Sequence, residues 1–256
     1  MRTENRKPKT ENRLLSALLF AMTFPTLAAW SYFLVLGKQG GHVNIWQQAA
    51  YIGGKVVQFA FPLVFLGVME RRFVLARSAS KGDLFPWLRY GLTFGLLVVA
   101  LMLGIYFGAL RGTEMLQQTP GRLQQKLREF NMATPARYLV LACFIVTAHS
   151  LLEEYYWRWF VFGQLRRLTT RTPAIALSSL AFMSHHVVIL YVYLPGRFWT
   201  AALPFSLGIA VGGAVWAWLY ERSGSLWPAW LSHLLIDAGV FAIGWDLLWP
   251  IRLIRG

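Results

Sequence analysis

The sequence contains a single cysteine and few acidic residues. Cys143 has no second cysteine to pair with, so a disulfide within the chain is excluded. The 256 residues include 11 Asp or Glu against 25 Lys or Arg, which gives a net charge of +14 at pH 7. Charged residues make up 14% of the chain, whereas a soluble domain has about 25%. The composition therefore argues against an ordinary soluble domain.

The N-terminal region lacks the pattern of a cleaved signal peptide. A short basic stretch, an apolar core and a small-residue cleavage site do not stand apart from the rest of the chain. The first apolar run is also long enough to cross a bilayer, and we expect it to be a retained helix. No internal repeat and no low-complexity tract is evident beyond a short polar tail, residues 1–13.

Hydrophobic residues make up 56% of the chain, and they are arranged in long uncharged runs. A membrane-spanning helix needs about 20 apolar residues. Seven runs are candidates: Leu14–Leu36, Trp46–Met69, Trp87–Leu110, Tyr138–Leu152, Pro173–Leu194, Phe198–Tyr220 and Leu226–Trp249. The fourth run is short, so we expect its helix to continue past Leu152, and an eighth span would arise if Trp157–Leu165 enters the bilayer. Because helices satisfy their own backbone polar groups in lipid, the pattern predicts an all-α, polytopic transmembrane helical bundle of seven or eight spans.

Basic residues between the runs predict the orientation of the chain. They are Arg2, Arg6, Lys7, Lys9 and Arg13 in the tail, Arg71, Arg72, Arg77 and Lys81 after the second run, and Arg166, Arg167 and Arg171 after the fourth. Alternation of the spans places all three groups on one side, which is the cytoplasmic side. Cations in these positions orient a membrane protein and contact anionic lipid, so we predict a bilayer environment and no nucleic-acid partner.

One segment conflicts with this orientation. Residues 111–137 should face outward, yet they contain five cations: Arg111, Arg122, Lys126, Arg128 and Arg137. Within the segment, Leu123, Leu127 and Phe130 recur at helical spacing opposite charged positions, which predicts an amphipathic helix on the bilayer surface. A miscounted span is the competing interpretation.

Ionisable residues divide the chain into two regions. The first three runs contain almost none apart from Lys55. A charged residue at mid-helix costs about 2.5–3.5 kcal/mol on insertion scales, so such residues tend to face a cavity and to have partners. The later runs contain many candidates: His149, Glu153, Glu154, Arg158, His185, His186, His233, Asp237 and Asp246. The contrast predicts an anchoring region at 14–137 and a catalytic transmembrane region at 138–250.

Helical geometry predicts which of these groups can meet. Glu154 and Arg158 are four residues apart and can pair on one helix face. Glu153 is turned by about 100°, so we expect it to be left unpaired and able to take a proton. A charge cluster that caps the span and reaches the headgroups is the alternative. His233 and Asp237 also share a face. They could bind a metal, hold a water or face a developing oxyanion, or they could only satisfy each other by a hydrogen bond.

The histidines of the fifth run add a third element. His185 and His186 are adjacent, so they differ in direction by about 100° and at most one of them faces the centre of a shared cavity. A single histidine in an apolar span is more often a core residue than a ligand. Two of them, between a carboxylate pair upstream and a His-Asp pair downstream, favour a site.

Three motifs occur in order along these runs: "EEYYWR" with Glu153, Glu154 and Arg158, "FMSHH" with Phe182 and His186, and "SHLLID" with His233 and Asp237. A glycine-rich run and the turn "RSGSLW" precede the last motif. With these features, residues 138–240 resemble the CPBP family of intramembrane proteases, which contains the CAAX prenyl proteases type II and the Abi, bacteriocin-processing group. Residues 1–137 resemble no family that we can name.

The resemblance implies a mechanism and a role for each motif residue. By resemblance, Glu153 is the general base for a water that attacks the scissile carbonyl, and His186 positions that water. His233 and Asp237 would stabilise the oxyanion, and Glu154 and Arg158 would orient the cluster. Most relatives carry Asn where Asp237 stands, and an ionised carboxylate cannot donate to an oxyanion. Asp237 is therefore either held neutral by burial or acts as an acceptor that orients His233.

A metal is the only cofactor that the motifs suggest. Members of the family are often described as metalloproteases, and Glu153, His186, His233 and Asp237 could supply nitrogen and oxygen ligands for Zn²⁺. The sequence lacks the H-E-x-x-H motif of zinc proteases. A glutamate-activated water without a metal is equally compatible with these residues.

The leading functional prediction is an endopeptidase of the bacterial cytoplasmic (inner) membrane, with its N-terminus in the cytoplasm. Its partners would be the bilayer and a membrane-inserted or lipid-modified protein or peptide substrate. A non-proteolytic scaffold or regulator on the same fold is the main alternative, and the complete set of motif residues argues against it. A small transporter with a His/Glu proton relay is a third interpretation, which the lack of an inverted repeat weakens.

Overall fold

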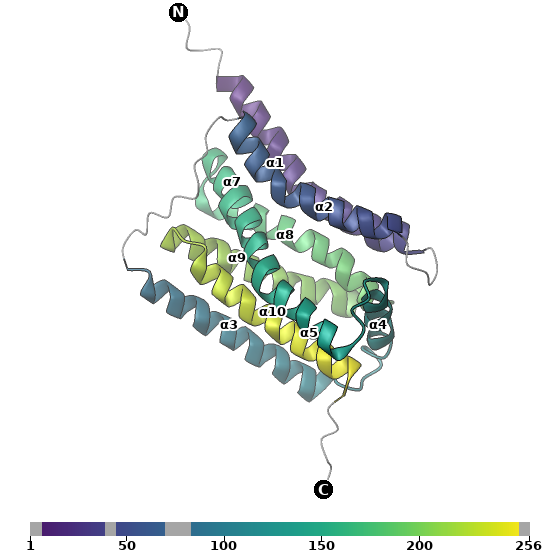
Figure 1. Cartoon of the computed structure of the whole chain (residues 1–256). Helices are drawn as coiled ribbons and strands as arrows, with labels where there is room; N and C mark the ends of the chain where they lie inside the picture. Colours follow the sequence, from purple (N-terminus) through teal and green to yellow (C-terminus); the bar gives the residue numbers. More distant parts are fainter. Residues whose placement is uncertain (1–6, 39–44, 70–82, 251–256) are drawn as a thin grey trace, which may run out of the picture.

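The computed structural model describes residues 7–38, 45–69 and 83–250. These residues form a bundle of helices without any strand in the described part (Figure 1). Within the same ranges seven helices are long and apolar enough to cross a membrane: Glu11–Val35, Ile45–Gly67, Phe85–Leu110, Pro135–Leu168, Arg171–Tyr193, Phe198–Ser223 and Trp227–Leu248. The predicted all-α membrane bundle is confirmed.

The described residues contain ten α-helices along the chain. They are α1 (Lys7–Trp30), α2 (Ile45–Val64), α3 (Phe85–Ile105), α4 (Thr119–Glu129), α5 (Pro135–Phe144), α6 (Ser150–Glu154), α7 (Gly163–Leu168), α8 (Arg171–Tyr193), α9 (Leu203–Ser223) and α10 (Trp227–Leu248). A 3₁₀ turn, Leu36–Lys38, follows the first span. Several spans contain π-helical segments: Ser31–Val35, Phe65–Met69, Tyr106–Leu110, Ile145–His149, Tyr155–Phe162 and Phe198–Ala202.

Two boundaries differ from the sequence prediction. The fourth span runs unbroken from Pro135 to Leu168, which confirms that it continues past the glutamates. Trp157–Leu165 therefore belongs to this span and adds no eighth one, so the count in the described residues is the lower of the two that the sequence allows. Helix α1 begins at Lys7, inside the predicted tail, because polar residues can continue a helix beyond the apolar run where water satisfies the backbone.

Some predictions fall outside the described residues. Arg2 and Arg6 of the tail, and Arg71, Arg72, Arg77 and Lys81 after the second span, lie there. The predicted orientation of the chain therefore rests on the sequence. The proposed boundary between an anchoring region and a catalytic region at residues 137 and 138 also stays a prediction.

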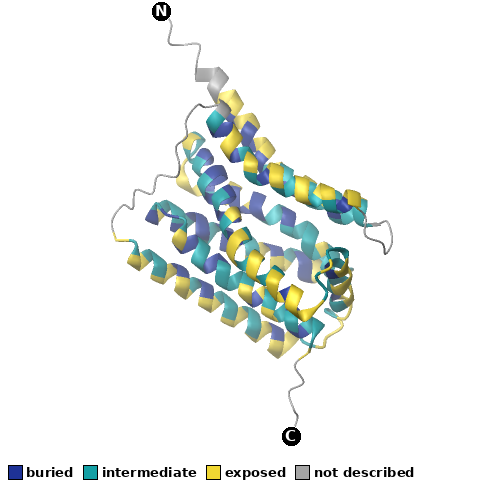
Figure 2. Ribbon diagram, viewed as in Figure 1, coloured by how far each residue is buried: buried dark blue, intermediate teal, exposed yellow. Residues whose placement is uncertain are grey.

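The helices pack so that early and late spans share one body. Helix α3 lies along α10, α8 lies along α9, and α1 packs against both α8 and α2 (Figure 1). The largest fully buried side chains include Trp157, Tyr156 and Phe160 of the fourth span, so this span lies at the centre. Exposed residues gather on the outward faces of the helices (Figure 2). Among them are large apolar side chains such as Leu19 and Leu97, as expected for surfaces that face lipid.

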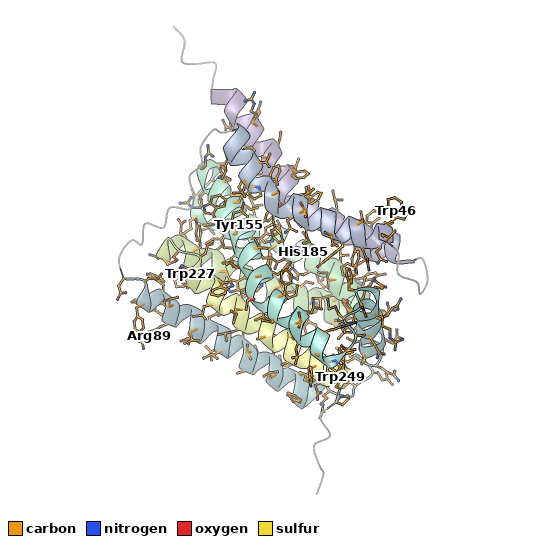
Figure 3. The ribbon with its side chains drawn as sticks, viewed as in Figure 1. Trp46, Arg89, Tyr155, His185, Trp227 and Trp249 are labelled. Carbon is orange, nitrogen blue, oxygen red and sulfur yellow. The ribbon has the colours of Figure 1, made fainter. Side chains whose placement is uncertain are left out.

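Aromatic residues mark the ends of the spans. Trp46, Trp227 and Trp249 lie at helix ends near the margins of the bundle, whereas His185 lies inside it (Figure 3). Tryptophan is enriched at both membrane–water interfaces because its ring is apolar and its N–H is polar. The positions of these three residues therefore agree with a bilayer that covers the middle of the bundle.

The close contact between α3 and α10 depends on a small residue. A Cβ atom added at Gly91 would overlap the backbone carbonyl oxygen of Pro228. Small residues allow helix backbones to approach closely in membranes, where packing drives helix association. Gly91 is therefore required by the spacing of these two helices.

We expect Gly91→Ala to destabilise the bundle by about 1–3 kcal/mol, the usual effect of overpacking. The measurement is thermal unfolding of the purified protein in detergent. Gly104→Ala is the matched control, because Gly104 lies on the same helix and a Cβ atom added there would meet no neighbouring atom within 4 Å. Equal melting temperatures for the two variants would contradict this account of the contact.

The predicted amphipathic helix is present as α4, at one end of the bundle (Figure 1). Its Leu127 is buried, and the Thr119 hydroxyl donates a hydrogen bond of 3.0 Å to the carbonyl oxygen of Tyr193. Helix α4 packs against α8 and α10. The apolar face therefore packs, at least in part, on protein.

A partly buried ion pair ties the preceding loop to α10. The Arg111 guanidinium donates two hydrogen bonds to the Asp246 carboxylate, at 2.8 and 2.9 Å, and the Tyr106 hydroxyl donates a third at 2.7 Å. The hydrogen bonds to Asp246 raise the pKa of Arg111 above its usual value. Asp246, an ionisable residue of the last span, therefore binds residues at the end of the third span.

Candidate active site

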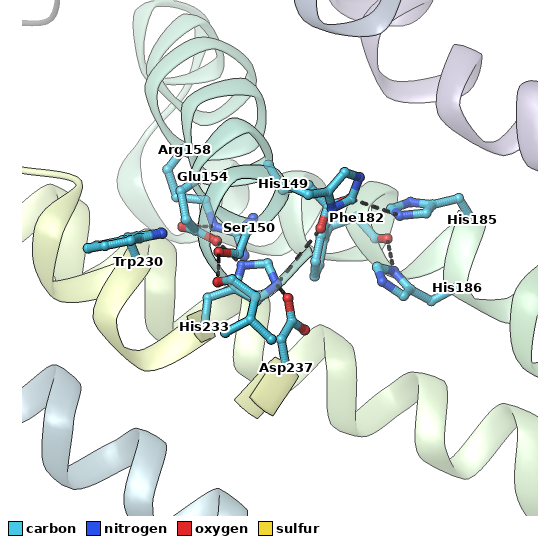
Figure 4. A network of polar contacts seen from close by, with 12 residues as sticks. His149, Ser150, Glu154, Arg158, Phe182, His185, His186, Trp230, His233 and Asp237 are labelled. Atoms are coloured by element: carbon cyan, nitrogen blue, oxygen red, sulfur yellow. Dashed lines mark hydrogen bonds and ion pairs between the residues drawn. The ribbon is translucent and has the colours of Figure 1, made fainter. Parts of the chain in front are cut away.

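The polar residues of the later spans meet in the middle of the bundle (Figure 4). The fourth span contributes His149, Glu153, Glu154 and Arg158, α8 contributes His185 and His186, and α10 contributes His233 and Asp237. Two π-helical segments, Ile145–His149 and Tyr155–Phe162, enclose the short helix α6 that carries both glutamates. Such π segments occur frequently at functional sites. Here they set the directions in which the two carboxylates point.

Glu154 is held by two partners. Its Oε2 lies 3.2 Å from Arg158 Nε, and its Oε1 lies 2.8 Å from His233 Nδ1. All three residues are buried. The predicted pairing of Glu154 with Arg158 is confirmed. Because a carboxylate only accepts hydrogen bonds, Nδ1 of His233 is the donor in the second contact.

Aromatic rings enclose this ion pair. The Arg158 guanidinium carbon lies 4.6 Å from the centroid of the Phe182 ring and 4.9 Å from that of Trp216. The Trp216 ring also stacks on His233, with centroids 4.2 Å apart and planes inclined by 16°. A cation over an aromatic face is attracted by the ring quadrupole. The motif residue Phe182 therefore has a clear role, which is to hold the arginine.

Glu153 lies among four nitrogen atoms. Its Oε1 is 3.9 Å from Lys55 Nζ, 3.9 Å from His149 Nε2 and 3.8 Å from His185 Nε2. Its Oε2 is 3.8 Å from His233 Nε2. These separations are those of ion pairs and exceed the 2.7–3.2 Å of a direct N–H···O hydrogen bond. The prediction that Glu153 has no charged partner is wrong, because the cation comes from α2 and not from its own helix.

The two histidines of α8 have different surroundings. His185 is buried, approaches Glu153 and lies parallel to the Trp157 ring, with an angle of 4° between the planes. His186 has its Nδ1 3.0 Å from the carbonyl oxygen of Phe182, one turn earlier on the same helix. The motif assigns a site role to His186, whereas in the structure it is His185 that lies near Glu153. The expectation that the two differ in direction agrees with this geometry, and the role given to His186 stays a prediction.

Asp237 lies at the edge of the cluster. Its Oδ2 is 3.6 Å from His233 Nε2, and its side chain is partly exposed. This distance is too long for a direct hydrogen bond. The predicted neighbourhood of His233 and Asp237 on one face of α10 is therefore present, and the two possible roles of the aspartate remain predictions.

One member of the cluster was not predicted as a site residue. Lys55 belongs to α2, in the region that we expected only to anchor the protein, and it reaches Glu153 from there. A signal for it exists in the sequence, because Tyr51, Lys55 and Gln58 recur at the spacing of one helix face within an otherwise apolar run. This spacing does not predict which residues the polar face of α2 contacts.

The arrangement offers a carboxylate and several imidazoles that are largely buried in the bundle. Within the described ranges, no group of three or more His, Cys, Asp or Glu side chains is placed so that it could hold a metal ion. The possible zinc ligand set Glu153, His186, His233 and Asp237 stays a prediction. What the geometry places together is the Glu153 carboxylate and the imidazoles of His149, His185 and His233.

Comparison with known proteins agrees with this chemistry. Residues 135–239 match the family model described as type II CAAX prenyl endopeptidase Rce1-like. The match spans the residues from the start of α5 to just beyond Asp237, so it includes all the motif residues and leaves out Lys55. No curated protein and no solved structure matches the chain. The segment that carries the glutamate pair and the histidines therefore matches the Rce1-like family of type II CAAX prenyl endopeptidases, which confirms the resemblance seen in the motifs.

Proposed function

We propose that this chain is an intramembrane endopeptidase that hydrolyses a peptide bond in a membrane-inserted or lipid-modified protein. The observation that carries the proposal is the position of Glu153, buried and surrounded by His149, His185 and His233 in the segment that matches the endopeptidase family. A buried carboxylate beside imidazoles is the arrangement that a glutamate-activated water requires.

In the proposed reaction, Glu153 accepts a proton from a water molecule while the water oxygen bonds to the scissile carbonyl carbon. The resulting oxyanion is stabilised by donors in the low-dielectric interior, where such contacts are stronger than in water. Glu153 then returns the proton to the leaving nitrogen as the carbon–nitrogen bond breaks. Atoms balance, because one water is consumed and one carboxyl and one amine are formed.

His233 is the proposed oxyanion donor. In its imidazolium form it donates through Nδ1 to Glu154, at 2.8 Å, and through Nε2 toward the oxyanion. Arg158 fixes Glu154 and so fixes the ring of His233. The Asp237 carboxylate lies 3.6 Å from this same Nε2. We therefore assign Asp237 the second of its two roles, that of an acceptor that orients the His233 ring before the oxyanion forms, because an ionised carboxylate cannot donate.

The description of the matching family, which refers to CAAX prenyl endopeptidases, supports a lipid-modified substrate as the first to test. We propose a prenylated C-terminal peptide as the first probe of activity. The proposed location is the bacterial cytoplasmic membrane with the N-terminus in the cytoplasm, on the evidence of the basic residues. In this orientation the segment with α4 lies on the opposite side.

The direct test is cleavage of a farnesylated, internally quenched CAAX peptide by the purified protein in liposomes. In water enriched in oxygen-18, we expect mass spectrometry to find one heavy oxygen in the newly formed carboxyl group, because the attacking oxygen comes from water. The same peptide without the farnesyl group is the control for recognition of the lipid. No product from either peptide, with a folded protein, would favour the scaffold interpretation.

A further inference from the structure

Lys55 is the only charged side chain of α2, and it lies far from both ends of its span. It is ten residues after Ile45, the first residue of α2, which at 1.5 Å per residue is about 15 Å. The other end of the span, Gly67, is still further away. A lysine side chain at this depth cannot reach the headgroups. A charge at mid-helix is costly in a membrane unless it has a partner.

The rotation of α2 directs Lys55 to the inside of the bundle. The side chain of Gln58, three residues later on the same face, is buried, whereas Val56 and Val57, which point away from that face, are exposed. The Lys55 ammonium lies 5.5 Å from the centroid of the Phe59 ring and 3.9 Å from Glu153 Oε1. The lysine therefore has both a carboxylate and an aromatic neighbour.

The charges around the two glutamates show why this contact matters. Glu154 has a permanent cation on its own helix, Arg158. The other side chains near Glu153 are His149, His185 and His233, whose rings carry a charge only when they are protonated. Among the described residues, Lys55 is thus the one Lys or Arg that forms an ion pair with Glu153.

We infer that Lys55 is a positioning residue for the hydrolysis, in which its ammonium holds the Glu153 carboxylate in place and offsets its charge inside the membrane. The inference rests on the proposed function. It extends the site beyond residues 135–239, because the residue that places the base belongs to a span outside the family match. The N-terminal half is then part of the catalytic machinery as well as an anchor.

The inference predicts a split between kcat and KM. In Lys55→Met the carboxylate loses its partner, and a base misplaced by about 1 Å can lower the rate about 100-fold. We expect a fall in kcat of that size on the farnesylated peptide, with KM nearly unchanged because Lys55 lies against the base. Lys55→Arg keeps the cation and should keep most of the activity.

A matched control is available elsewhere in the chain. Lys126 is also partly buried and also pairs with a glutamate, at 2.7 Å from Glu129 Oε2. Lys126→Met removes a comparable cation from α4, outside the site, and should leave kcat at the level of the unaltered protein. Equal kcat for Lys55→Met and the unaltered protein would overturn the inference.

Restoring an ammonium group chemically at position 55 distinguishes a loss of positioning from a loss of folding as the cause of lower activity. The chain has one cysteine, Cys143, so Cys143→Ala provides a background in which Lys55→Cys is the only thiol. The Lys55 side chain is 26% exposed, which allows a reagent to reach this position in the folded protein. An aminoethyl thiosulfonate reagent, which adds an ammonium, should raise kcat at least about tenfold above a propyl reagent of similar length that adds no charge.

The outcomes distinguish this inference from the proposed function. If the unaltered protein cleaves the probe, Glu153→Gln does not, and the propyl group restores activity as well as the aminoethyl group does, only the role of Lys55 is wrong. If Glu153→Gln cleaves the probe as fast as the unaltered protein does, the glutamate mechanism fails, and the role of Lys55 fails with it. If the unaltered protein does not cleave the probe, the proposed function fails and the role of Lys55 in hydrolysis fails with it.

Discussion

Replacing Glu153 with Gln should lower kcat on the farnesylated peptide by roughly 10²–10⁴-fold, the usual contribution of a general base. Glutamine has the same shape as glutamate, so the packing of this buried side chain changes little. Its amide cannot accept a proton from water at neutral pH. The loss should therefore appear in kcat, while KM stays close to its original value because the substrate-binding surface is intact. The measurement is steady-state kinetics in liposomes.

Two further variants make this result interpretable. Glu221→Gln removes a glutamate from a part-exposed ion pair with Arg166, and it should leave kcat unchanged. Glu153→Asp keeps the charge but withdraws the carboxylate by one methylene, so its rate should lie between those of the unaltered protein and Glu153→Gln. Thermal unfolding of each variant shows whether the bundle is intact. Undiminished turnover in a folded Glu153→Gln protein would remove the proposed mechanism.

The second large effect concerns stability. Arg158→Met should destabilise the protein by about 3–5 kcal/mol, because it leaves the buried charge of Glu154 without its cation. The side chains of Arg158 and Glu154 are 2% and 0% exposed, so water cannot replace the lost partner. Contacts of the guanidinium with Phe182 and Trp216 disappear in the same variant. Unfolding by heat in detergent measures the change.

A double variant tests the cause of that effect. Glu154→Gln combined with Arg158→Met removes both charges, and it should be more stable than Arg158→Met alone, because no uncompensated charge remains. Arg166→Met supplies the comparison at the surface. The Arg166 and Glu221 side chains are 31% and 27% exposed, and pairs accessible to solvent contribute about 0–1 kcal/mol. A double variant no more stable than Arg158→Met would show that lost packing, and not the charge, causes the instability.

The membrane spans could be predicted closely from the sequence. An apolar run of about 20 residues can only be accommodated in lipid as a helix, so length and composition alone determine where each span lies. The predicted start at Trp46 and end at Leu110, for example, differ by no more than one residue from the spans in the structure. The possible eighth span does not arise, because a run of π-helix, Tyr155–Phe162, carries the fourth span onward without a turn.

Contacts within one helix could be predicted for the same kind of reason. Glu154 and Arg158, and likewise His233 and Asp237, are four residues apart, and the helical repeat brings such residues to one face wherever the helix lies. The order of the three motifs indicated the family, which the match of residues 135–239 confirmed. For these features, local geometry and residue order carry all the information that is needed.

Contacts between helices were decided only by the tertiary structure. The sequence shows that Lys55 is a lone charge in an apolar run, but the partner of that charge depends on how α2 is rotated and how deep it lies against the fourth span. The same holds for the approach of His185, instead of His186, to Glu153. The π segments on both sides of the glutamates add to this, because they shift the direction of each following side chain away from the regular 100° step. Packing angles and helix rotation are collective properties of the bundle, and no local pattern in the sequence specifies them.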